Sequence, residues 1–243
     1  MLVVLSHSAD LSARWAFERL RARSRRTVEL VLIESLGAAA TGWRHELGSD
    51  DARTDIRLAD GRRLQSGGVT CVLNRMLQPP LAPVASAVPG DADYARNELT
   101  AFAASWIRTL APLVVNEPTP QGLSGRWRAP LHWRILALDA GLPVAPLTFD
   151  SADPPPLAYG LGAEPSMTVL TIGGEPLAGA MPAAVREAAR RFARLAQTPV
   201  LGLRFAGADP SRTGWRLLDA TPYPDLSSAG ETGISALETQ LGA

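Results

Sequence analysis

The sequence predicts an α/β fold in its first half and an α+β fold in its second half. Short continuous apolar runs are typical of strands buried on both faces of a parallel sheet. Helical patterns separate these runs in the first half, whereas later strands follow one another around glycine turns. The division between the two halves is expected near residues 116–126.

Strands and helices are expected to alternate along the first half. The strands are expected at 1–6, 28–33, 69–73 and 113–116, and the helices at 10–23 and 91–110. The second helix has the clearer pattern, because apolar side chains recur at three- and four-residue spacing from Leu99 to Leu110. In the first helix, Leu11, Trp15 and Leu20 are expected along the apolar side. A hairpin centred on Asp60-Gly61 is expected on the edge or surface of the sheet.

The second half should combine antiparallel strands with helices. Its helices are expected at 130–140, 182–196 and 234–241, its strands at 144–149, 200–205 and 215–219, and a hairpin at 167–178 around Gly173-Gly174. Pro130 is suited to a first helical turn and Gly141 to the position after a helix end. The proline-rich stretch 151–165 is expected to be a loop.

Composition excludes several classes of protein. With 24 basic and 24 acidic residues the net charge is zero, so nothing favours a nucleic-acid partner or an anionic membrane surface. No apolar run reaches the roughly 18 residues of a spanning helix, and the opening run is too short for a signal peptide. A bacterial cytoplasmic protein is therefore expected. The single cysteine, Cys71, is interpreted as a buried apolar residue, with a reactive thiol as the alternative.

All 24 basic residues are arginine, and the chain contains no lysine. Arginine keeps its charge and does not form the imines that a lysine amine forms. The sequence thus excludes Schiff-base chemistry and any phosphate site built on a lysine.

Three segments, in order, resemble the RimK-type and graspetide-type ATP-grasp ligases. The strand before Asn74-Arg75 resembles a strand that ends in arginine in that family. The runs LVVNEP at 113–118 and ALDAGLPV at 137–144 resemble its second stretch, and LGLRFAGAD at 201–209 with WRLLDATPYPDL at 215–226 resembles its last. The resemblance implies a Rossmann-like pre-ATP-grasp domain at 1–118 and a reduced ATP-grasp domain at 119–243.

The chain departs from this family where the family holds nucleotide. One family lysine falls on Pro130, and the other belongs to a central subdomain for which residues 149–167 are too few. The family's metal-binding E-x-N falls on Asp219-Ala220-Thr221, where threonine supplies only a neutral hydroxyl. Arg126 and Arg128 are the arginines expected to replace lysine at a phosphate.

Candidate binding residues follow strands of the expected parallel sheet. His7, Ser8, Arg75 and Asn116 would lie at the carboxyl edge, where open α/β sheets bind ligands. Three of them have a structural alternative: Ser8 as a helix cap, Arg75 in a salt bridge and Asn116 in a turn.

Other candidates lie outside that edge. Arg204 alternates with apolar residues of its strand and is expected to point into a cleft, while Asp209 and Asp219 could form a vestigial metal pair. The alternatives for the aspartates are a surface turn and an ordinary strand end. His45 is expected to be exposed, and the arginines 186, 190 and 194 to form a solvated helix face or a docking surface for an acidic partner.

Three functions remain open. The leading hypothesis is a catalytically degenerate ATP-grasp relative, without a cofactor, that holds a peptide or a partner enzyme in a biosynthetic or peptide-modification pathway. The second is an active carboxylate–amine ligase that binds Mg²⁺ and ATP with arginines. The third is a small-molecule binder that uses the N-terminal cleft. Self-association into a homo-oligomer is left open.

Overall fold

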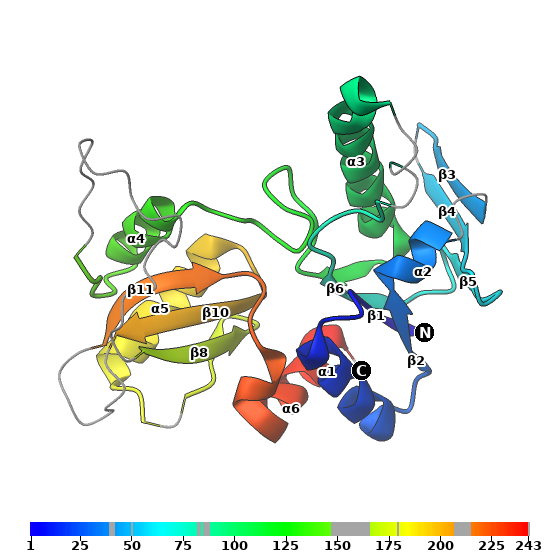
Figure 1. The fold of residues 1–243 in the computed structure, drawn as a ribbon. Helices are drawn as coiled ribbons and strands as arrows, with labels where there is room; N and C mark the ends of the chain where they lie inside the picture. Colours follow the sequence, from blue (N-terminus) through cyan, green and yellow to red (C-terminus); the bar gives the residue numbers. More distant parts are fainter. Residues whose placement is uncertain are drawn as a thin grey trace. The chain divides into compact units, whose positions relative to one another are not determined.

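The computed structural model describes residues 1–38, 42–49, 51–81, 84, 88–146, 166–178, 180–206 and 215–242. The chain forms two compact units (Figure 1). The first contains Met1–Arg126 together with Leu237–Ala243, and the second contains Trp127–Ala236. The units therefore divide after residue 126, and the end of the last helix groups with the first unit.

The first unit is built on a parallel four-stranded sheet in the order β2-β1-β6-β7. Its strands are β1 (Leu2–Ser6), β2 (Val28–Leu32), β6 (Cys71–Arg75) and β7 (Leu113–Val115). Every residue of β1 and β6 is buried, which confirms the prediction from their continuous apolar runs. The chain leaves β1 toward β2 on one side and reaches β6 on the other, so the carboxyl ends of β1 and β6 flank the switch point of the sheet.

Two long helices belong to this unit, α1 (Leu11–Arg23) and α3 (Ala92–Leu110). The predicted apolar stripe of α3 is confirmed, because Trp106, Ile107 and Leu110 are buried in the core. A 3-10 turn, η3 (Pro89–Asp91), precedes α3, and the Asp91 side chain makes no capping bond. The apolar side predicted for α1 is wrong at Leu11, which is 73% exposed, whereas Leu20 is buried together with Ala13 and Ala16.

A second, antiparallel sheet packs in the same core. It contains β3 (Trp43–Leu47), β4 (Ala52–Arg57) and β5 (Arg63–Gln65), and β4 and β5 form the predicted hairpin. The strand β3 and the short helix α2 (Ile33–Ala38) were not predicted. β3 is largely polar, so it has no apolar run from which it could be recognised, and α2 starts at an isoleucine that reads as the end of β2.

The second unit is an antiparallel sheet in the order β11-β10-β8-β9. Its strands are β8 (Ser166–Ile172), β9 (Glu175–Pro176), β10 (Val200–Ala206) and β11 (Arg216–Thr221), and its helices are α4 (Pro130–Asp139) and α5 (Ala183–Ala196). The hairpin between β8 and β9 is confirmed, with positive φ at both glycines of its turn, Gly173 and Gly174. Trp133 of α4 and Phe192 of α5 are fully buried together with the apolar residues of β10.

The chain ends in a 3-10 turn, η4 (Leu226–Ala229), and α6 (Gly230–Leu241), which begins before the residue 234 predicted for it. Val144 makes a parallel bridge to Leu217 beside β11. The expected loop at 151–165 lies outside the described residues. None of the described helices has the length and apolarity needed to cross a bilayer.

Candidate functional site

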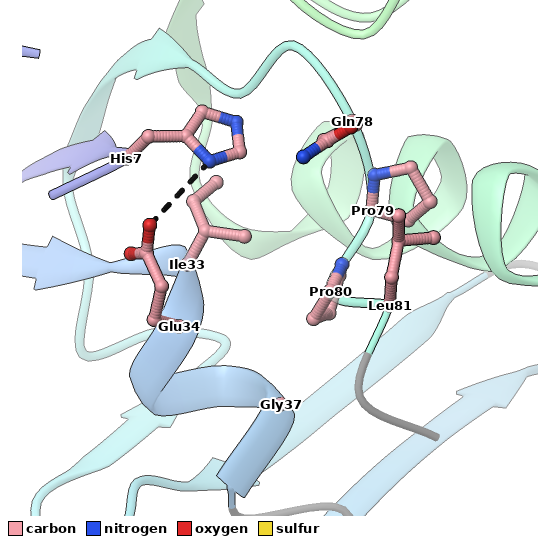
Figure 2. Close-up of a pocket in the computed structure, with 8 residues that line it drawn as sticks. All are labelled: His7, Ile33, Glu34, Gly37, Gln78, Pro79, Pro80 and Leu81. Atoms are coloured by element: carbon pink, nitrogen blue, oxygen red, sulfur yellow. Dashed lines mark ion pairs between the residues drawn. The ribbon is translucent and has the colours of Figure 1, made fainter. Parts of the chain in front are cut away.

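His7 lies directly after β1, at the switch point of the parallel sheet. Its Nε2 accepts a hydrogen bond from the backbone N–H of Leu77 at 3.2 Å, which requires an unprotonated Nε2. The hydrogen of the neutral ring is therefore assigned to Nδ1, which lies 3.8 Å from Oε1 of Glu34 (Figure 2). This places a carboxylate and an imidazole side by side at the carboxyl edge.

Ser8 orients the carboxylate of Glu34. Its backbone N–H donates to both carboxylate oxygens, at 3.1 and 3.2 Å, and its hydroxyl donates to Oε1 at 3.0 Å. Partial burial raises the pKa of Glu34, but hydrogen bonds from the backbone of Glu34 and from Ser8, with the charge effect of His7, outweigh burial and leave the pKa below its ordinary value. Glu34 is thus an ionised carboxylate at neutral pH. Ser8 does not cap α1, because Asp10 does.

These side chains border a pocket of about 200 Å³. We call it the Glu34 pocket, and its lining residues are His7, Ile33, Glu34, Gly37, Gln78, Pro79, Pro80 and Leu81. Figure 2 shows His7 and Glu34 on one side and Gln78 to Leu81 across from them. The sequence did not single out the pocket residues of α2, which are Ile33, Glu34 and Gly37, or those of the segment after β6. Only the fold brings α2 to this segment.

Arg75, at the end of β6, is buried in an ion pair. Its Nε lies 2.5 Å from Oδ2 of Asp10, and its Nη2 donates to the hydroxyl of Ser12 at 3.1 Å. The side chains of Arg75 and Asp10 are only 4% and 3% exposed. The structure thus shows the salt bridge that was the alternative at Arg75, and a ligand role for this residue stays a prediction.

Asn116 follows β7 in the left-handed region, with φ of 58°. Its carbonyl accepts a hydrogen bond from Nδ2 of Asn74 at 2.8 Å, and the carbonyl of Leu123 accepts a second one at 2.6 Å. Oδ1 of Asn74 accepts from the backbone N–H of Met76 at 3.1 Å. Asn74 is fully buried and ties the ends of β6 and β7 to the turn that follows β7.

In the second unit, Arg204 and Asp219 are paired across β10 and β11. The register shifts immediately after this pair, which is a bulge of the kind that re-aims side chains. Burial raises the pKa of Asp219, and the positive charges of Arg204 and Arg134 offset this only in part. Arg134 of α4 is buried, and its Nη1 donates to the carbonyl of Ala145. Arg134 was missed from the sequence because it lies in a helix whose other buried residues are apolar.

The two arginines expected near a phosphate belong to different units. Arg126 ends the first unit, and its buried Nε has no hydrogen-bond acceptor among the described residues. Arg128 lies in the second unit, where its guanidinium is 5.5 Å from the ring centre of Trp133 and Nη2 donates to the carbonyl of Ala196. Arg128 therefore supports the packing of α4 and α5.

The surroundings of Asp219 do not fit a divalent cation. Mg²⁺ prefers carboxylate and other oxygen ligands, whereas Asp219 is influenced by two guanidinium groups. The other expected ligand, Asp209, lies outside the described residues. In the described part of the chain, no group of three or more His, Cys, Asp or Glu side chains could hold a metal ion.

Two further predictions need correction. His45 is not exposed: it is half-buried on β3, with Nδ1 3.0 Å from the hydroxyl of Thr54 and Nε2 2.8 Å from that of Ser105. The arginine row of α5 is only partly a solvated face. Arg190 forms a two-pronged ion pair with Glu175, and Arg186 donates to backbone carbonyls of β9 and the residues after it.

The chain combines a parallel and an antiparallel sheet and matches the fold of ATP-grasp ligases over its full length, which confirms the predicted fold class. Among solved structures, the chain is similar to macrocyclase MdnC of Microcystis aeruginosa MRC bound with precursor peptide MdnA, with a TM-score of 0.70 and 10% identity over 100% of both chains. It is also similar to ATP-grasp ligase PsnB complexed with minimal precursor, Mg and ADP, with a TM-score of 0.63 and 16% identity over 100% of this chain and 98% of that one.

A third similar structure is a RiPP-associated ATP-grasp ligase of Chryseobacterium gregarium in complex with ADP and a leader and core peptide. Its TM-score is 0.65 and its identity 6%, over 98% of this chain and 96% of that one. At such identities the likeness establishes the fold alone. No protein-family model matches the chain, and no curated protein matches it.

Proposed function

We propose that this protein is a peptide-binding relative of the ATP-grasp ligases that holds a peptide, or a partner enzyme, in a peptide-modification pathway without transferring phosphate. Peptide binding is supported by the similar structures: that of MdnC contains a precursor peptide, and that of the Chryseobacterium gregarium ligase contains a leader and core peptide. The proposal that phosphate transfer is lost rests on the chain itself.

The environment of Asp219 is the observation that carries the proposal. In the family that the sequence resembles, this position belongs to the metal-binding motif. Here its carboxyl group is half-buried and has a raised pKa, and the charges of two arginines, Arg204 and Arg134, act on it. A charged transition state on phosphate needs cations aimed at the transferring oxygens. Arg134 donates to the carbonyl of Ala145 and, with Arg204, offsets the charge of Asp219, so neither arginine is aimed at a phosphate, and the chain has no lysine to replace them.

One alternative has an observation in its favour. Arg134 and Arg204 both act on Asp219, so a nucleotide that displaced the carboxylate would meet two positive charges. An active ligase that binds ATP with arginines is therefore the second candidate. Removing one positioned cation costs about 10²- to 10³-fold in rate, so this ligase would need both arginines.

Titration with Mg²⁺–ATP separates the two candidates. Calorimetry and thermal melting of the full chain are expected to show no nucleotide binding. Nucleotide binding at about 50 μM or tighter would overturn the proposal if it is lost in Asp219→Ala and kept in a control variant. The control is Asp139→Ala, whose side chain lies on the exposed part of α4. Peptide binding is tested by co-elution with precursor peptides and enzymes encoded beside the gene, and a chain that elutes alone with all of them contradicts the scaffold role.

A further inference from the structure

We propose that the Glu34 pocket binds a basic side chain of the peptide, with the ammonium or guanidinium group against Glu34 and the aliphatic stem against the apolar wall. The inference rests on the proposed peptide-binding function, but it concerns a site in the first unit that is separate from Asp219. It assigns a chemical class of ligand to a pocket whose role is otherwise open.

The charge of the pocket selects a cation. Among the described residues that line the pocket, Glu34 is the one acidic residue and none is an arginine. Three hydrogen-bond contacts from Ser8 hold its carboxylate in place before any ligand arrives. A preset carboxylate loses little side-chain entropy when it pairs with a cation. The opposite rim carries Gln78, whose amide oxygen can accept a further hydrogen bond.

The far wall of the pocket is apolar and has few donors. Pro79 and Pro80 are buried, Ile33 is only 2% exposed, and Leu81 is half-buried. Proline has no backbone N–H, so this wall presents no donor there to a carboxylate or phosphate. Lysine and arginine side chains bury their aliphatic stems on apolar surface while the charged group stays near polar partners. The combination of wall and carboxylate matches such a side chain.

The volume limits the ligand to a small group. At about 200 Å³ the pocket is smaller than the roughly 300–1,000 Å³ of sites for drug-sized molecules. One side chain is therefore a better match than a nucleotide. A metal ion is a poor match, because a single carboxylate faces the pocket and Nε2 of His7 already accepts from Leu77.

The test uses the full chain and four blocked pentapeptides, Gly-Gly-X-Gly-Gly, in which X is lysine, arginine, norleucine or glutamate. Binding is followed by NMR at the ring of His7 and the amide of Leu77. We expect the lysine and arginine peptides to bind about three- to fivefold more tightly than the norleucine peptide, as for a half-exposed ion pair. The glutamate peptide should not bind.

Variants assign the effect to the pocket. Glu34→Gln should reduce the affinity for the lysine and arginine peptides to that for the norleucine peptide. The control Glu46→Gln changes an exposed carboxylate that is paired with Arg44 on β3, and it should leave these affinities unchanged. If Glu34→Gln fails to fold, Leu81→Trp provides a second variant that fills the apolar end and should weaken all binding.

Two outcomes would overturn the inference: norleucine binding as tightly as lysine, or no peptide moving the His7 and Leu77 signals. A precursor peptide that binds while the basic pentapeptides do not would defeat the pocket assignment and leave the proposed function standing. Conversely, Mg²⁺–ATP binding lost in Asp219→Ala would defeat the proposed function without affecting the pocket.

Discussion

Arg75 and Asp10 form a buried ion pair although 65 residues separate them, with Nε 2.5 Å from Oδ2. The second oxygen of Asp10, Oδ1, accepts from the backbone N–H of Ala13 at 2.9 Å and caps α1. One carboxylate therefore joins the end of β6 to the start of α1. This contact sets the position of the loop that carries His7 and Ser8.

Removing one partner of this buried ion pair is expected to destabilise the protein strongly, because the other charge stays buried without a partner. Arg75→Met leaves Asp10 charged and buried without its partner, and should lower the free energy of unfolding by about 3–5 kcal/mol. Urea denaturation followed by circular dichroism measures the change. The double variant Asp10→Asn/Arg75→Met should recover part of the loss, because asparagine still caps the helix and no buried charge remains.

A matched control is Arg96→Met, which removes an exposed partner of Asp93 on α3. Its unfolding curve should overlay that of the unmodified protein, as is usual for surface ion pairs. If Arg75→Met behaved like this control, the pair would not be desolvated as the structure has it.

Asn74 should be as sensitive as a core apolar residue. Asn74→Ala removes the partners of the carbonyls of Asn116 and Leu123 and of the N–H of Met76. Each unsatisfied buried group costs about 1–3 kcal/mol, so a loss of at least about 3 kcal/mol in the free energy of unfolding is expected. Chemical denaturation provides the measurement, and Asn97→Ala, on the exposed face of α3, is the control. A small change in the free energy of unfolding of Asn74→Ala would mean that water replaces the hydrogen bonds that the Asn74 side chain makes.

His45 makes stability depend on pH. Burial lowers the pKa of His45 below its ordinary value of 6.5, and a hydrogen bond with the backbone of Arg53 opposes this only in part. Between the folded-state pKa and pH 6.5 the unfolded chain binds more protons than the folded chain. The contribution of His45 is therefore fully present above pH 6.5 and is lost as the pH falls through that window.

The experiment compares thermal melting of the unmodified protein and of His45→Gln across pH 5 to 8. The unmodified protein should lose stability at the acidic end more steeply than the variant, because glutamine does not titrate. Equal slopes for the two proteins would show that His45 is not held neutral by its surroundings.

The regular elements could be predicted where burial leaves a periodic trace. β1, β6 and α3 follow from continuous apolar runs or a three- and four-residue stripe, since the pattern itself records which positions are buried. β3 left no such trace, because its residues are mostly polar and it is held by β4 and α3. Leu11 was misplaced because the buried face of α1 is formed by Ala13, Ala16 and Leu20, and Leu11 lies off that face.

The sequence by itself determined the strands of the parallel sheet, the candidate edge after β1, β6 and β7, and the lack of any lysine. Only the tertiary structure decided the partners of the polar side chains: Arg75 with Asp10, Ser8 with Glu34, and Arg134 near Asp219. Apolar burial is encoded locally by spacing, whereas a buried polar group takes its partner from whatever distant segment the fold brings within hydrogen-bond distance.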